Sequence, residues 1–142
     1  MIYTNLTKKA LIISFNAHKN QVDKSGLPYI HHPLHLAEQM DDEYSTCVAL
    51  LHDVIEDTKI ALEDIKNEGF PSEVVEAISY LTRDKNVDYM SYVANIKNNK
   101  IATKVKIADL NHNSDLSRLN KVLDKDLKRV EKYKLALELL QK

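Results

Sequence analysis

The sequence CVALLHDVIED at residues 47–57 places a histidine and several acids inside an apolar segment. The spacing of its apolar residues predicts a helix with these side chains packed inward: Cys47, Val48, Leu51, Val54 and Ile55. On such a helix His52 and Glu56 share one face, as do Asp53 and Asp57. Burying these groups is costly unless they are paired or bind a metal. The segment therefore predicts a core helix that carries a polar site.

Helix-breaking residues are scarce, because the 142 residues include only two glycines and three prolines. Strands and hairpins need such residues often, so their scarcity favours long helices. Apolar residues at steps of three and four agree, most clearly near the C-terminus. We expect an all-α fold, a helical bundle that forms a single domain over residues 1–142. The expected helices cover residues 6–17, 33–40, 44–57, 62–68, 71–81, 87–96, 101–111 and 123–140, with a loop at 21–32.

Charge and cysteine content exclude several classes of protein. The chain has twenty basic and twenty-one acidic residues. The resulting net charge of -1 argues against a protein that binds long nucleic acids. Cys47 is the single cysteine, so no internal disulfide forms and a reducing compartment is expected. No apolar run approaches the roughly 20 residues that span a bilayer. We therefore expect a cytoplasmic protein that does not bind a membrane.

Two further segments place polar groups where a packing residue is expected. In IATKVKIADL, residues 101–110, Asp109 follows Val105 by four positions and so falls on the inner stripe of the helix. His32 precedes Pro33, and a residue before proline is pushed toward extended geometry. We expect His32 to be held stiffly at the mouth of the next helix, which is a suitable place for a ligand.

Together these segments supply two imidazoles and two carboxylates from three separate elements. A mixed set of nitrogen and oxygen donors without thiolate suits Mn²⁺, Fe²⁺, Co²⁺ or Zn²⁺. Anchored at three points, such a set holds one divalent ion inside the bundle and leaves positions for water and substrate. The predicted metal ligands are His32, His52, Asp53 and Asp109.

The order and the flanking residues of these motifs resemble the HD superfamily of metal-dependent phosphohydrolases. The more specific resemblance is to the hydrolase domain of the RelA/SpoT type, and it extends from about His18 to Leu119. It rests on KSGLPYIHHP at residues 24–33, ALLHDVIEDT at 49–58 and VKIADLNHN at 105–113. That domain removes the 3′-pyrophosphate from guanosine tetra- and pentaphosphate with Mn²⁺, so the resemblance makes Mn²⁺ the first choice among the metals.

The resemblance also assigns roles within the expected site. It implies that the two histidines and two aspartates ligate the ion, and that a metal-activated water attacks phosphorus. Glu56 and Asp57 match the pair that handles this water. Lys24, Ser25 and Asn113 match positions near the nucleotide. The expected protein is therefore a phosphohydrolase that acts on a small nucleotide.

Two departures from the family pattern leave other functions possible. Asp23 stands where the family has a basic residue, and Leu110 stands where it commonly has arginine. These changes leave room for a nucleotidase that releases phosphate from nucleoside monophosphates at the same site. The alternative outside enzymes is a non-catalytic sensor of a nucleotide or metal, against which the intact Glu56–Asp57 pair argues.

Overall fold

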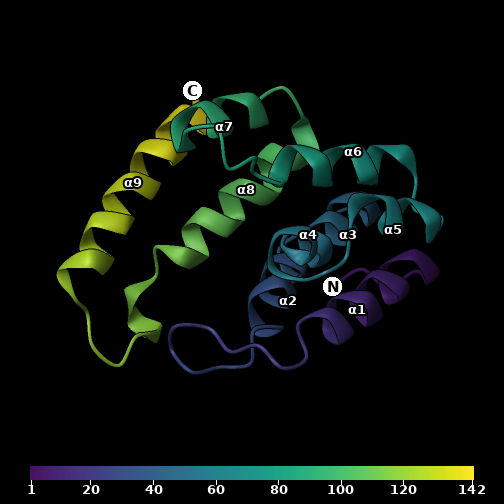
Figure 1. Cartoon of the computed structure of the whole chain (residues 1–142), viewed down its shortest axis with the longest axis horizontal. Helices are drawn as coiled ribbons and strands as arrows, with labels where there is room; N and C mark the ends of the chain where they lie inside the picture. The colour runs from purple at the N-terminus through teal and green to yellow at the C-terminus, as the bar shows by residue number, and fades with distance from the viewer.

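The computed structural model describes residues 1–142 and is all-helical, which confirms the predicted fold class (Figure 1). The one extended pairing is an isolated bridge between Val22 and Pro28 in the first loop. In chain order the elements are α1 (Asn5–Ala17), α2 (His31–Glu38), α3 (Glu43–Leu51), α4 (Val54–Asp57), α5 (Leu62–Asn67), α6 (Ser72–Leu81), α7 (Tyr89–Ile96), α8 (Lys100–Asn113), the short 3-10 helix η1 (Leu116–Arg118) and α9 (Asp124–Gln141).

Helix α3 is the centre of the bundle. It packs against α1, α2, α6 and α8, and every side chain from Ser45 to Leu51 is buried. A helix covered on all sides has no polar face, which explains why this segment is apolar nearly throughout. Its C-terminal end points the following residues, His52 and Asp53, into the middle of the molecule.

The predicted single helix over residues 44–57 is wrong, because the chain breaks between α3 and α4. Asp53 has φ -102° and ψ -3°, angles that interrupt the regular helical ladder. A new turn then begins, in which the N–H of Asp57 donates to the carbonyl of Asp53 at 3.0 Å. Because the linking residues keep near-helical angles, the apolar spacing of the sequence does not reveal this break.

The start of α2 also differs from the expectation. The helix begins at His31, so His32 is helical rather than extended, and the loop ends two residues earlier than predicted. The N–H of His32 donates to the carbonyl of Tyr29 at 3.0 Å, and this turn outweighs the preference of a residue before proline. Pro33 lies in the first turn as expected, where its missing N–H costs nothing.

Helix α9 is the last helix of the bundle. It packs against α7 and α8, and η1 connects it to α8 at the end of the bundle where the loop of residues 18–30 also lies (Figure 1). Sequence-distant segments therefore meet around the C-terminal half of α8. None of the helices combines the length and the apolar composition needed to cross a bilayer.

Candidate metal centre

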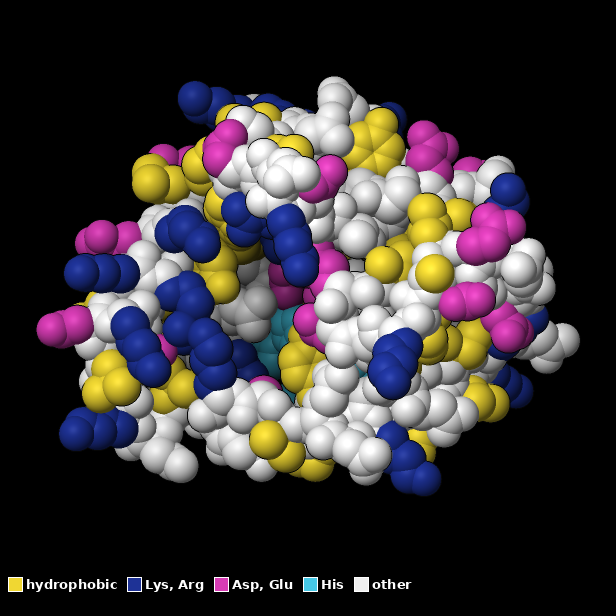
Figure 2. Space-filling view, in the orientation of Figure 1, with side chains coloured by type: hydrophobic (Ala, Val, Ile, Leu, Met, Phe, Trp, Pro, Cys, Tyr) yellow, Lys and Arg dark blue, Asp and Glu magenta, His cyan; other side chains and the backbone are white.

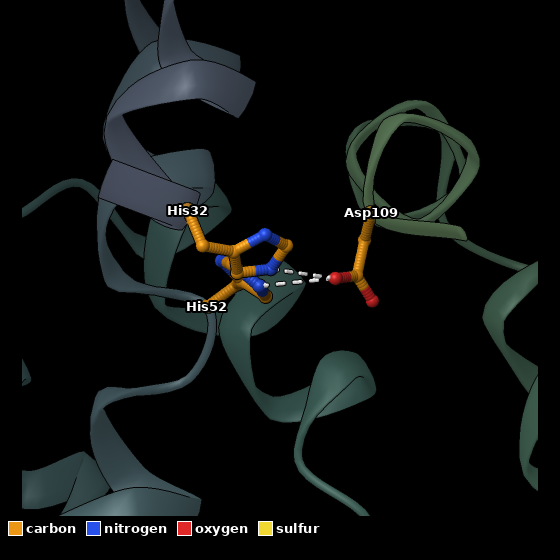
Figure 3. Close-up of side chains that lie close together, drawn as sticks. All are labelled: His32, His52 and Asp109. Carbon is orange, nitrogen blue, oxygen red and sulfur yellow. Dashed lines mark hydrogen bonds and ion pairs between the residues drawn. The ribbon is translucent and has the colours of Figure 1, made fainter. Parts of the chain in front are cut away.

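Three of the four predicted metal ligands form a buried cluster (Figure 3). His32 comes from α2, His52 follows α3, and Asp109 lies on α8. One ligand atom from each residue lies within 4.8 Å of the others. The Nε2 atom of His32 is 2.8 Å from Oδ1 of Asp109, and Nε2 of His52 is 3.6 Å from the same oxygen.

The fourth predicted ligand, Asp53, lies at the edge of this cluster. Its Oδ2 atom is 2.8 Å from Nε2 of His52 and 3.7 Å from Nε2 of His32, and it accepts a hydrogen bond from the Tyr29 hydroxyl. Ligand bonds of about 2.1 Å place neighbouring donor atoms about 3.0–3.4 Å apart around one ion. The four measured separations, from 2.8 to 3.7 Å, bracket that spacing.

The imidazole of His52 is oriented by the backbone. Its Nδ1 atom donates to the carbonyl of Ala49 at 2.7 Å, because a carbonyl can only accept. When this ring is neutral, it therefore presents the lone pair of Nε2 to the cluster. That nitrogen is buried and makes no hydrogen bond. A buried acceptor without a donor, facing two carboxylates, is the arrangement that a bound cation satisfies.

The imidazole of His32 is oriented by a second histidine, His112 of α8. The two Nδ1 atoms are 2.7 Å apart. Burial lowers the pKa of His112 to about 3, and Arg118 adds to this effect. The neutral His112 ring therefore accepts a hydrogen bond from the Nδ1–H group of His32, and Nε2 of His32 is left free to face the cluster.

Asp109 is held as a carboxylate by its neighbours. Burial opposes its charge, but the Lys106 ammonium and the nearby rings of His32 and His52 outweigh burial and keep the pKa of Asp109 well below its usual range. Nζ of Lys106 donates to Oδ2 at 2.9 Å, and Nδ2 of Asn113 donates to Oδ1 at 3.0 Å. Lys106 precedes Asp109 by three residues on α8, so the two side chains share one face of the helix.

The donor set of the cluster fits a divalent metal. Two imidazoles and two carboxylates, without thiolate, suit first-row metals of borderline hardness. Burial disfavours a charged His52, yet the carboxylates of Asp53 and Asp109 raise its pKa well above the ordinary value. The same two negative charges attract a cation when the ring is neutral.

A pocket of about 300 Å³ adjoins the cluster and contains His32 in its wall. The predicted nucleotide-binding residues Lys24, Ser25 and Asn113 all line it. Figure 2 shows Lys and Arg side chains gathered beside a hollow near α9, with histidine visible at its floor. The sequence did not single out Arg129 and Tyr133 of α9, which also line the pocket, because α9 alternates charges as a solvated helix does.

Glu56 and Asp57 lie on α4, one turn beyond the cluster, and neither lines the pocket. Oε1 of Glu56 accepts a hydrogen bond from the N–H of Arg83. Partial burial raises the pKa of both carboxyl groups, and the nearby charge of Asp53 raises them further. The structure thus places two carboxyl groups with raised pKa values near Asp53.

The sequence profile of the HD domain family matches residues 10–113. The chain belongs to the HD domain family. This confirms the resemblance seen in the three motifs, and it accounts for a histidine–aspartate pair at the end of a buried helix. HD hydrolases use divalent metals, so the buried cluster of this HD domain is compatible with one.

Two curated relatives show which proteins contain a similar domain. This HD domain is 42% identical over 83 residues to a GTP pyrophosphokinase of Myxococcus xanthus, covering 56% of this chain and 11% of that protein. It is 35% identical over 124 residues to the bifunctional (p)ppGpp synthase/hydrolase SpoT of Escherichia coli K12, covering 75% and 17%. The chain therefore spans less than a fifth of the length of these relatives.

A solved structure shares the whole fold of the HD domain. It is described as that of a metazoan orthologue of SpoT that hydrolyses ppGpp, and it matches with a TM-score of 0.81 at 22% identity. The match covers 99% of this chain and 88% of the other. At this identity the likeness establishes the fold.

The two departures from the family pattern have distinct structural effects in this HD domain. Leu110 is fully buried in the core, so no cation occupies that position. Oδ1 of Asp23 accepts hydrogen bonds from the N–H groups of Ser25 and Leu27, and Oδ2 pairs with Nη1 of Arg118 at 3.3 Å. Asp23 thus shapes the loop of the pocket and neutralises one of its arginines.

Proposed function

We propose that this HD domain is a metal-dependent phosphohydrolase that removes the 3′-pyrophosphate from guanosine 3′,5′-bis(diphosphate). The observation that carries the proposal is the juxtaposition of the buried cluster and the cationic pocket, which share His32. Relatives named for (p)ppGpp hydrolysis add support for this substrate.

His32, His52, Asp53 and Asp109 are the proposed ligands of one ion, with Mn²⁺ first and Fe²⁺, Co²⁺ or Zn²⁺ as metals that suit the same donors. When bound, such an ion lowers the pKa of water and neutralises charge on phosphoryl oxygens. The residues behind the ligands keep the donor atoms aimed at one point, since Ala49, His112 and Lys106 each fix one of them.

Glu56 and Asp57 are the proposed acceptors of the proton that the attacking water loses. Their raised pKa values make them stronger bases than exposed carboxylates, which favours proton transfer. As the water oxygen bonds to phosphorus, the bond from phosphorus to the 3′ oxygen breaks. The products are pyrophosphate and a nucleoside 5′-diphosphate whose 3′ oxygen has gained a proton.

Lys24, Ser25 and Asn113 are the proposed substrate contacts, together with Arg129. The two cations face a substrate that carries several negative charges, while a hydroxyl and an amide provide directional hydrogen bonds. Burial lowers the pKa of Lys24, and Arg129 lowers it further. Two neighbouring cations in the wall of one pocket are poised to receive an anion between them.

The proposal is tested by pyrophosphate release from guanosine 3′,5′-bis(diphosphate) with Mn²⁺. Asp53→Ala removes a ligand of the ion, and the loss of several kcal/mol lowers kcat by about a thousandfold. Asp41→Ala is the matched control, because Asp41 is exposed and pairs with Lys104 away from the pocket. This control should retain kcat within about twofold. An unmodified, Mn²⁺-loaded protein that releases no pyrophosphate contradicts the proposal.

A nucleotidase is the second candidate, and Asp23 is the observation that favours it. The Asp23–Arg118 pair leaves less free positive charge for a polyphosphate. A nucleotidase releases phosphate from nucleoside monophosphates and little pyrophosphate from the bis(diphosphate). Tight nucleotide binding without any product identifies the third alternative, the sensor.

A further inference from the structure

Three histidines outside the proposed ligand set gather on one side of the bundle. His31 and His35 are exposed and lie four residues apart on α2, while His112 reaches them from α8. Their ring centroids form a triangle with sides of 6.1, 5.6 and 4.1 Å. The proposed hydrolysis uses none of the three as a ligand, and only His112 has a part in it, behind His32.

This spacing is that of a transition-metal site. Two histidines at positions i and i+4 project from one face of a helix, the arrangement that binds zinc in other helical motifs. Metal–nitrogen bonds of about 2.0–2.1 Å place the ring centroids of two imidazoles on one ion about 5 Å apart. The measured triangle brackets that value. His31 and His35 are exposed, so rotation about their side-chain bonds can turn their nitrogens toward one ion.

The third histidine, His112, has one ring nitrogen that makes no hydrogen bond. Nδ1 of His112 faces His32, whereas its Nε2 carries no hydrogen bond. Arg118, which disfavours positive charge at His35, and Asp115, which favours it, are the charged groups beside that ring. The surroundings therefore neither exclude a cation nor supply a competing ligand as strong as imidazole.

We propose that His31, His35 and His112 form an outer site for a transition-metal ion, distinct from the buried cluster. Among divalent ions, imidazole donors favour Cu²⁺, Ni²⁺ and Zn²⁺ over Mn²⁺. The outer site is therefore selective for metals other than the one proposed for hydrolysis.

His112 couples the two sites, a consequence that rests on the proposed role of His32. A ligand at Nε2 of His32 leaves the proton of that ring on Nδ1, where it is donated to His112. A ligand at Nε2 of His112 leaves the proton of His112 on its own Nδ1, where it faces His32. Two nitrogens 2.7 Å apart have room for one proton between them. Each ion therefore weakens the other, and by linkage the effect is reciprocal.

Zinc titration of the full chain by calorimetry tests the outer site without any activity assay. We expect two Zn²⁺ ions for the unmodified protein and one for the double variant His31→Ala/His35→Ala, whose substitutions are exposed and leave the core intact. Gln39→Ala, an exposed change at the end of the same helix, is the matched control and should retain two. A double variant that still binds two ions overturns the outer site.

A second measurement tests the coupling. In His52→Ala the buried cluster loses a ligand, and the outer site should bind Zn²⁺ about tenfold more tightly than in the unmodified protein. Far-UV circular dichroism checks that this variant is folded, and Asp53→Asn serves in its place if it is not. An unchanged outer affinity overturns the coupling. Neither titration depends on hydrolysis, so a failure of the outer site can be distinguished from a failure of the proposed function.

Discussion

The buried cluster and the cationic wall of the pocket lie side by side, yet they are built differently. In the cluster, the side chains of His32, His52 and Asp109 are at most 7% exposed, and a neighbour fixes the far atom of each one. In the wall, Arg118 and Arg129 reach inward on long side chains, and each is tied by one ion pair to an aspartate.

The difference follows from what each region has to do. Metal ligands must converge within fractions of an ångström, which requires buried and hydrogen-bonded supports. Phosphate groups can be attracted by charges that keep some freedom, and the Arg118 and Arg129 side chains are 21% and 18% exposed. A single change in the cluster should therefore disturb the fold and the metal together, whereas a change in the wall should act mainly on substrate binding.

The largest expected effect comes from Lys106→Met, which leaves Oδ2 of Asp109 buried without its partner. Breaking a buried ion pair costs about 3 kcal/mol, so the free energy of unfolding should fall by that amount in metal-free protein. Added Mn²⁺ should restore part of the loss, because a bound cation replaces the missing charge. Urea denaturation with and without Mn²⁺ measures both effects.

Lys104→Met is the matched control for that experiment, because Lys104 lies two residues away on the same helix and pairs with Asp41 and Asp42 at the surface. It should cost at most about 1 kcal/mol, with no added response to Mn²⁺. Equal losses for the two variants would remove the contrast between buried and exposed charges.

A smaller effect is expected from Arg129→Gln in the wall. Loss of one charge-assisted hydrogen bond should raise KM for guanosine 3′,5′-bis(diphosphate) about tenfold and leave kcat within about threefold. Lys134→Gln, an exposed change elsewhere on α9, should leave both constants unchanged. Steady-state kinetics with Mn²⁺ decide the outcome, and a fall in kcat at constant KM would place Arg129 in the chemical step instead.

The smallest effect is expected from Tyr29→Phe, at the boundary between the two regions. The Tyr29 hydroxyl donates to Oδ2 of Asp53, and Tyr29 also lines the pocket. Loss of a hydrogen bond worth about 1 kcal/mol should weaken Mn²⁺ binding about fivefold. Equilibrium dialysis measures this change, and an unaltered affinity would show that Asp53 needs no support from Tyr29.

Local patterns predicted the helices and the inward placement of the proposed ligands, because both depend on short-range spacing. The break between α3 and α4 was missed because Asp53 departs only slightly from helical angles. The helical conformation of His32 was missed because its hydrogen-bonded turn with Tyr29 outweighs the local preference of a residue before proline. Arg129 and Tyr133 were missed because they lie far along the chain from every motif and on a helix of mixed charge.

The sequence by itself determined that this chain is helical and that it carries histidines and aspartates on inward faces, because helical periodicity and the cost of burying charge are properties of neighbouring residues. Only the tertiary structure decided that these groups meet, that His112 and Lys106 stand behind them, and that α9 brings cations to the pocket. Such meetings depend on how helices pack across long separations, which no local spacing encodes.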